Sequence, residues 1–186
     1  MSGLLSEAQQ QFLLRLARGA IKLKLETGET IKAGTNDPLL LAKRGAFVTL
    51  KSGGRLRGCI GYPLPYKPLA GTVIDSAIMA ATQDYRFEPI TPDQLPGIRI
   101  EISVLSLPHP AKDGREVEIG IHGIIISKGH NKGLLLPQVP LEYGWDRETY
   151  LSHGCLKAGL DEDEWKKGAN IEIFSAQVFS EPDSAE

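Results

Sequence analysis

The sequence predicts an α+β fold, in which a mainly antiparallel or mixed β-sheet is flanked by helices. A β-hairpin is indicated at residues 46–61, where two apolar segments flank the turn Ser52-Gly53-Gly54. Residues 98–105 alternate between aliphatic and polar side chains, which is typical of a strand with one buried face. No βαβ unit is evident along the chain, so an antiparallel sheet is favoured over a parallel one.

The first element is a helix that begins after Ser6. Ser6 and Gln9 have the spacing of a capping box, in which two free amides are satisfied reciprocally. Apolar residues then recur at helical spacing until Thr27-Gly28 ends the segment. A second start signal, Asn-Asp-Pro, predicts a short helical turn that ends near residue 41.

The remaining elements follow from the same patterns of spacing and turn residues. In chain order they are strands at 46–50 and 56–61, a helix within 68–84, a strand at 98–105, a loop at 109–114, strands at 120–127 and 133–136, a helix from Asp146 to about Ala158, a helical turn at 161–167 and a strand at 171–178. We therefore expect one domain over residues 1–180, followed by a flexible C-terminal tail at 181–186.

The composition is that of an ordinary globular protein and argues against several functional classes. Hydrophobic residues make up 41% and charged residues 24%, and the formal net charge is −2. Non-specific binding to DNA is therefore not expected. Polar residues interrupt the N-terminal segment, which argues against a signal peptide or a membrane span. Two cysteines do not make a disulfide scaffold, so we expect a cytoplasmic protein with reduced thiols.

Five segments, in this order along the chain, carry a resemblance to a known family. They are LRGCIGY at 56–62, YRFEPITPDQLPGIRIEISVLS at 85–106, GIHGIIIS at 120–127, GLLLPQV at 133–139 and WDRETYLSHGCLKAGL at 145–160. Together they resemble the AMMECR family, whose microbial members are labelled protein A of the AmmeMemoRadiSam system. The resemblance implies one α+β unit with two lobes and a cleft, and association with a Memo-like protein and a radical-SAM protein. It implies no settled reaction, and the cofactor is unknown.

The segment RLRGCIGY at 55–62 holds the strongest candidate for chemistry. In a strand, Arg57 and Cys59 lie on the same face, and a neighbouring cation favours the thiolate, which is the nucleophilic form of cysteine. Gly58 and Gly61 would let a substrate or another backbone come close. The family motif carries arginine and cysteine at these positions, so the resemblance implies that they are site residues. The alternative is that Cys59 is a small buried residue of the sheet, as free cysteines often are.

Three further residues are candidates for the same site, each with a structural alternative. His122 is a candidate base, or else a histidine whose ring is satisfied by the backbone at the start of a strand. Glu101 is a candidate acid or base, or else part of a solvated strand face. Gln138 follows a proline and offers a neutral donor and acceptor, either as a helix cap or as a ligand contact.

No metal site is predicted. His153 and Cys155 are close in the sequence, but residues two apart on a helix point to different sides, and their spacing is not that of a zinc motif. We expect Cys155 on the buried face of its helix. RNA binding stays open as an alternative because basic residues gather around the hairpin, namely Arg44, Lys51, Arg55 and Arg57.

Two functional classes therefore remain open. In the first, the protein is an enzyme or enzyme subunit that acts on a small molecule, RNA or protein. Cys59 would be the thiolate and Arg57 its activator or an anion binder, while His122 or Glu101 would act as the acid or base. In the second, the protein is a non-catalytic adaptor in an AmmeMemoRadiSam assembly, and the same motifs line a groove for a partner. The accessibility of Cys59 distinguishes the two classes.

Overall fold

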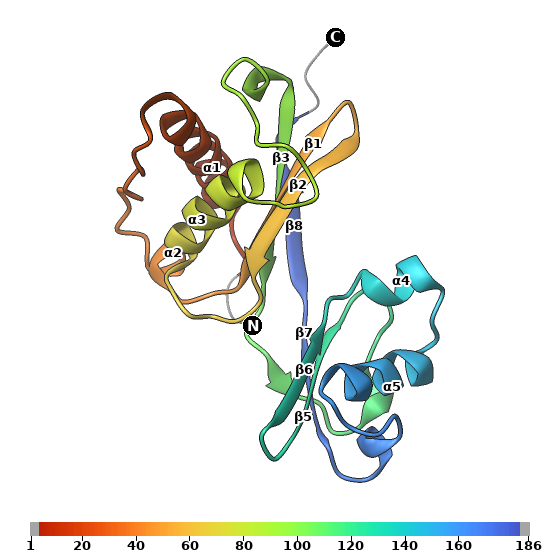
Figure 1. Ribbon diagram of the computed structural model, residues 1–186. Helices are drawn as coiled ribbons and strands as arrows, with labels where there is room; N and C mark the ends of the chain where they lie inside the picture. Colours follow the sequence, from red (N-terminus) through yellow and green to blue (C-terminus); the bar gives the residue numbers. More distant parts are fainter. Residues whose placement is uncertain (1–3, 183–186) are drawn as a thin grey trace. The chain divides into compact units, whose positions relative to one another are not determined.

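The computed structural model describes residues 4–182, which divide into two compact units (Figure 1). Unit 1 contains residues 4–105 and 177–182, and unit 2 contains residues 106–176. Unit 2 is therefore an insertion between two segments of unit 1. Each unit has its own sheet, helices and hydrophobic core, which confirms the predicted α+β class.

Unit 1 is built on a four-stranded sheet with the order β2-β1-β3-β8. The hairpin predicted from the glycine turn is confirmed, because β1 is antiparallel to β2. Its register shifts once: Leu50 pairs with Gly58, whereas Lys51 pairs with Leu56. Arg57 is thus the extra residue of a β-bulge. The strands of this sheet are β1 (Ala46–Ser52), β2 (Arg55–Tyr62), β3 (Ile98–Leu105) and β8 (Ala176–Ser180).

The helices of unit 1 lie on one side of this sheet (Figure 1). They are α1 (Glu7–Thr27), α2 (Pro38–Leu41) and α3 (Leu69–Thr82), and a single 3-10 turn, η1 (Leu95–Gly97), precedes β3. The predicted capping box at Ser6 is present, and Gly28 ends α1 with a φ of 77°. The alternating aliphatic residues of β1 and β3 pack against α1 and α3 to form the core. No helix within residues 4–182 is both long and apolar enough to span a membrane.

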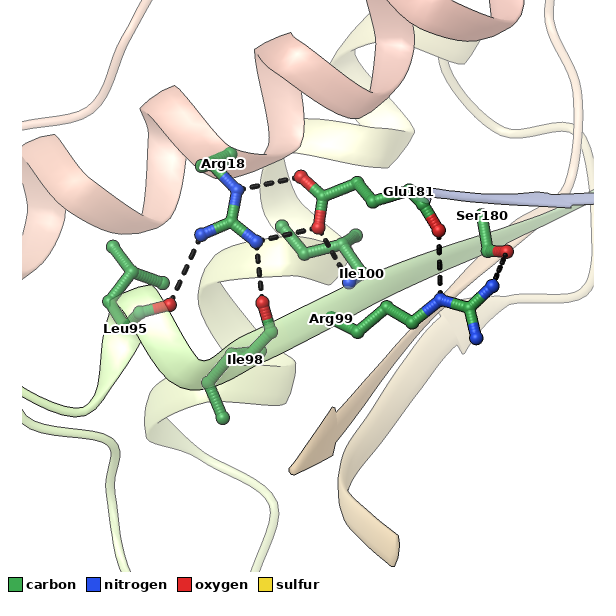
Figure 2. A network of polar contacts seen from close by, with 7 residues as sticks. All are labelled: Arg18, Leu95, Ile98, Arg99, Ile100, Ser180 and Glu181. Carbon is green, nitrogen blue, oxygen red and sulfur yellow. Dashed lines mark hydrogen bonds and ion pairs between the residues drawn. The ribbon is translucent and has the colours of Figure 1, made fainter. Parts of the chain in front are cut away.

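A polar network ties the C-terminal end of unit 1 to α1 and to the start of β3 (Figure 2). The guanidinium of Arg18 donates to both carboxylate oxygens of Glu181 at 2.6 Å, and it also donates to the carbonyls of Leu95 and Ile98. From the sequence we expected a flexible tail from residue 181 onward. In the structure, the Glu181 side chain takes part in this network. The last residues of the expected tail, 183–186, lie outside the described part of the chain.

Unit 2 has a second four-stranded sheet, with the order β4-β7-β5-β6. Its main helix begins at the predicted N-cap Asp146, whose carboxylate accepts a hydrogen bond from the Thr149 amide at 2.8 Å. Tyr150, Leu151 and Cys155 of this helix are fully buried in the core of unit 2. The elements of unit 2 are β4 (His109–Pro110), η2 (Gly114–Glu116), β5 (Gly123–Lys128), β6 (Asn131–Leu135), α4 (Val139–Tyr143), α5 (Arg147–Lys157), η3 (Glu164–Lys166) and β7 (Asn170–Phe174).

The predicted and observed elements differ in several places. The strand expected at 120–127 begins only at Gly123, because Gly120 has a φ of 80° within a turn. The strand expected at 171–178 is two strands, β7 and β8, which belong to different sheets. The elements β4 and α4 were not predicted, because segments of two and five residues are too short to show a period.

The two chain segments that connect the units are hydrogen-bonded to each other. The Ser106 amide donates to the Ser175 carbonyl at 2.8 Å, and the Ser175 amide donates to the Ser106 hydroxyl at 2.9 Å. Ser175 separates β7 from β8, and Ser106 directly follows β3. The points where the chain enters and leaves unit 2 are therefore side by side.

Candidate functional site

The face of the unit 1 sheet that α1 and α3 do not cover carries several of the predicted site residues. Strand alternation buries Val48 and Ile102 beneath the helices and directs their neighbours to the opposite face. We call this opposite face the helix-free face. It is formed by Phe47, Thr49 and Lys51 of β1, Cys59 and Gly61 of β2, and Glu101 and Ser103 of β3, all partly exposed.

Cys59 belongs to a row of three residues that crosses the helix-free face. Thr49 pairs with Cys59 on one side and with Glu101 on the other. The Thr49 hydroxyl donates a hydrogen bond to the Cys59 sulfur, at an Oγ1–Sγ distance of 3.2 Å. Glu101 forms an ion pair with Lys51, with 2.9 Å between Oε2 and Nζ. The structure therefore brings Cys59 and Glu101 onto one surface, with Thr49 between them.

An ion pair between the buried Asp84 and the exposed Arg86 holds the backbone of Cys59 from the outer edge of the sheet. β2 is an edge strand, and the Cys59 amide donates to the Asp84 carboxylate at 2.8 Å. The Arg86 guanidinium donates to the same carboxylate at 2.7 and 2.9 Å and to the Cys59 carbonyl at 3.3 Å. The side chain of Asp84 is only 2% exposed. Asp84 and Arg86 thus occupy backbone groups that a further strand would otherwise use.

The charges of this pair stabilise each other. Hydrogen bonds from the Arg86 side chain, and then from the Cys59 amide, hold the pKa of the Asp84 carboxyl far below its ordinary value, although burial opposes this effect. The hydrogen bond with Asp84 in turn raises the pKa of Arg86. Asp84 is therefore a carboxylate at neutral pH and a constant acceptor for the Cys59 amide.

The two glycines of the motif are accounted for by packing within unit 1. A Cβ atom on Gly58 would lie 2.2 Å from the carbonyl oxygen of Ala80 in α3. A Cβ atom on Gly61 would lie 2.3 Å from the carbonyl oxygen of Ala46 and 2.5 Å from the Phe47 ring. Gly58 thus permits close approach of another backbone, which is one of the two roles expected from the sequence. A role for either glycine in ligand binding remains a prediction.

The β-bulge removes the basis for expecting Arg57 on the same face as Cys59. The expectation that Arg57 and Cys59 share a face depends on regular alternation, and an extra residue breaks this alternation. The Arg57 side chain is partly exposed, and it has no ion-pair partner among residues 4–182. Two other basic residues near the hairpin are already engaged: Arg44 is buried, and Lys51 is paired with Glu101. This weakens the case for an RNA-binding hairpin.

His122 and Gln138 belong to unit 2 and not to the sheet that carries Cys59. The Nδ1 atom of His122 lies 3.1 Å from the Glu118 amide nitrogen and 3.1 Å from the Glu116 carbonyl oxygen, just before β5. Gln138 is exposed at the N-cap position of α4, and its side chain makes no capping hydrogen bond. Neither unit by itself contains all of the predicted site residues.

The second cysteine lies in a different environment from Cys59. Cys155 is fully buried, and burial is the main cause of the raised pKa of its thiol. His153, two residues earlier, stacks its ring on Trp145 with 3.8 Å between the ring centroids. The packing role expected for Cys155 agrees with this position.

Comparisons with known proteins agree with the resemblance found in the sequence. A profile of the family described as AMMECR1 matches residues 14–179. Protein MK0488 of Methanopyrus kandleri is 49% identical over 181 residues, which cover 92% of this chain and 87% of the relative. Protein MJ0810 of Methanocaldococcus jannaschii is 43% identical over 187 residues, which cover 96% of this chain and 92% of the relative.

A solved structure is similar to this chain as well. The crystal structure of the uncharacterized protein PH0010 from Pyrococcus horikoshii matches with a TM-score of 0.75 and 41% sequence identity. The match covers 91% of this chain and 90% of that chain. The chain belongs to the AMMECR1 family.

Proposed function

We propose that the protein is an enzyme or enzyme subunit in which the Cys59 thiol reacts with a substrate bound on the helix-free face. The observation that carries this proposal is that Cys59 is partly exposed and that its sulfur accepts a hydrogen bond from the Thr49 hydroxyl. A donor of this kind stabilises an anion, and the thiolate is the nucleophilic form of cysteine. The Asp84–Arg86 pair supports the proposal because it fixes the strand from which the sulfur projects.

The neighbouring charges suit a substrate that has an electrophilic centre beside an anionic group. Arg57, the bulge residue two positions before Cys59, is the proposed anion binder, because its guanidinium has no carboxylate partner within residues 4–182. Glu101, which Lys51 holds in place, is the proposed acid–base or orienting group on the same face. His122 of unit 2 is the second candidate for this role.

One observation favours a non-catalytic function instead. Within residues 4–182, Thr49 is the only side chain hydrogen-bonded to the Cys59 sulfur, and a hydroxyl is a poor base at neutral pH. In the alternative proposal, the helix-free face binds a segment of a partner protein. A Memo-like protein or a radical-SAM protein is then the expected partner, because the family resemblance implies association with these two proteins.

The reactivity of Cys59 tests the enzyme proposal directly. In a Cys155→Ala background, we expect iodoacetamide to modify Cys59 faster in the native protein than in the urea-unfolded chain at pH 7. A Thr49→Val variant should lose much of this advantage, because valine keeps the β-branched shape and removes the donor. A native rate no higher than the unfolded rate would count against the enzyme proposal.

Variants also separate the two proposals. If the protein is an enzyme, Cys59→Ser should abolish turnover without unfolding the protein. If it is an adaptor, Arg57→Glu should weaken binding to a purified Memo-like or radical-SAM protein, whereas Cys59→Ser should bind as the wild type does. Unchanged partner affinity in Arg57→Glu would argue against the adaptor. A cytoplasmic site of action belongs to both proposals, because reducing compartments keep thiols such as Cys59 free.

A further inference from the structure

Unit 2 contains a cavity that the proposed function does not use. It has a volume of about 380 Å³ and lies between η2, the first turn of α5 and the side chain of Trp165. This volume is within the range of about 300–1,000 Å³ that is usual for small-molecule sites. The cavity is built from unit 2 alone, so its geometry does not depend on unit 1.

The apolar surface of this cavity is that of the Trp165 ring, which is partly exposed. Leu151 also lines the cavity, but its side chain is fully buried in the core of unit 2 and offers no accessible surface to a ligand. The indole nitrogen of Trp165 lies 3.4 Å from the Ser152 hydroxyl, so the polar atom of the ring is already engaged. The Lys166 ammonium lies over the same ring, 4.7 Å from its centroid. What remains for a ligand is the rest of the aromatic surface, which suits a flat apolar group.

The carboxylates around the cavity each have a partner within unit 2. Asp113 accepts from the Arg115 side chain, at 2.7 Å for the shorter ion-pair contact. The Asp146 carboxylate caps α5 through the Thr149 amide. The Glu148 carboxylate is paired with the Lys166 ammonium at 2.9 Å. These acidic groups are therefore poorly placed to take up a ligand cation.

Arg147 is the charged group of the lining whose terminal guanidinium nitrogens have no hydrogen-bond partner among residues 4–182. Its Nε donates to the Val117 carbonyl at 2.7 Å, which fixes the position of the guanidinium. No carboxylate forms an ion pair with Arg147 among residues 4–182, although Asp113 is near enough for its charge to interact with that of Arg147.

From these contacts we infer that the cavity binds a small carboxylic acid with a flat apolar body. The carboxylate would accept hydrogen bonds from the terminal nitrogens of Arg147, and the body would lie against the ring of Trp165. A planar guanidinium that is already fixed at one nitrogen matches a carboxylate in two-point contact. A phosphate monoester shares the negative charge but is larger and tetrahedral, so we expect it to bind less tightly.

Trp165 provides a reporter for this site. The chain has two tryptophans, so a Trp145→Phe variant leaves Trp165 as the only source of tryptophan fluorescence. We expect phenylacetate to change this fluorescence saturably, and 2-phenylethanol, which lacks the carboxylate, to bind at least about tenfold more weakly. Phenyl phosphate tests whether the shape of the anion matters. Calorimetry with the unmodified protein checks that the variant has not created the site.

Two arginine variants form a matched pair. Arg147→Gln should weaken phenylacetate binding about tenfold or more, because it removes the charge that receives the carboxylate. Arg15→Gln changes an exposed arginine of unit 1 and should leave binding unchanged. The proposal is overturned if phenylacetate shows no saturable binding up to about 10 mM, a range that detects a millimolar Kd. Equal binding of 2-phenylethanol, or unchanged affinity in a folded Arg147→Gln variant, would overturn it as well.

Discussion

The Asp84 carboxylate, almost fully buried, accepts a hydrogen bond from the backbone amide of Cys59. The contact joins the segment after α3 to the outer edge of β2, and Arg86 completes it by donating to the Cys59 carbonyl. The backbone groups at the edge of the sheet are thus hydrogen-bonded at Cys59, the residue whose thiol is the candidate nucleophile.

Asp84→Asn should lower the free energy of unfolding by about 1–3 kcal/mol at pH 7, because Arg86 loses its buried counter-charge. The pKa of Asp84 is depressed in the folded protein, so its stabilisation is complete above the ordinary carboxyl pKa of about 3.9. It is lost as the pH falls further toward the folded value. The difference between wild type and variant, measured by urea denaturation, should therefore be constant from about pH 7 to 5 and shrink below about pH 4. A difference that does not change with pH would contradict this assignment.

Gly58→Ala should destabilise the protein by about 1–3 kcal/mol, because the new methyl group meets the Ala80 carbonyl and the backbone must move. Gly97→Ala is the matched control. A Cβ atom at Gly97 meets no atom within 4 Å, and this residue does not have a positive φ. We expect the control to change the unfolding free energy by less than about 0.5 kcal/mol. Equal stabilities of the two variants in chemical denaturation would show that the Ala80 carbonyl leaves room for a methyl group at residue 58.

Arg18→Ala should cost about 2 kcal/mol, because Glu181 and two backbone carbonyls lose one shared donor (Figure 2). Arg15→Ala, on an exposed position of the same helix, should be nearly neutral. Deletion of residues 181–186 removes the acceptor instead of the donor. Its effect should overlap with that of Arg18→Ala, so the double change should cost less than the sum in a double-mutant cycle. Additive effects would mean that the two groups act independently.

The two cysteines of the native protein should differ in alkylation by more than about tenfold. Cys59 is partly exposed, whereas Cys155 is fully buried with a raised pKa, so Cys155 should react only when unit 2 opens. Peptide mass spectrometry after a short exposure to iodoacetamide measures both sites in one sample. Comparable labelling would show that unit 2 opens readily or that Cys59 is shielded.

Local signals in the sequence were enough to predict most of the helices and strands. Ser6 with Gln9 and the Asp146 cap predict helix starts that the structure confirms, because a cap depends only on residues within one turn. The division of the strands between two sheets was not predictable in this way. Ile173 and Phe179 lie in one apparently continuous apolar pattern, yet they pack into different cores. Alternation identifies a buried face but not the core that buries it.

The candidate site shows the same limit. A two-residue turn at Gly53-Gly54 would, in a regular hairpin, place Gly58 opposite Thr49, and the β-bulge moves Cys59 there instead. Nothing in the composition of the hairpin signals this extra residue. Asp84 and Arg86 were missed as well, because their partner lies on a strand that is distant in the sequence. The only local signal is that Asp84 and Arg86 lie two residues apart, directly after α3.

The hydrogen bonds between Ser106 and Ser175 have a consequence for how the chain folds. β3 and β8 are neighbours in one sheet, yet the whole of unit 2 separates them along the chain. Closing a long loop costs conformational entropy, and such contacts slow folding. Once unit 2 has folded, Ser106 and Ser175 are held together, and the loop that β8 must close is reduced to a few residues. We therefore expect a folded unit 2 to lower the entropic cost of adding β8 to the sheet of unit 1.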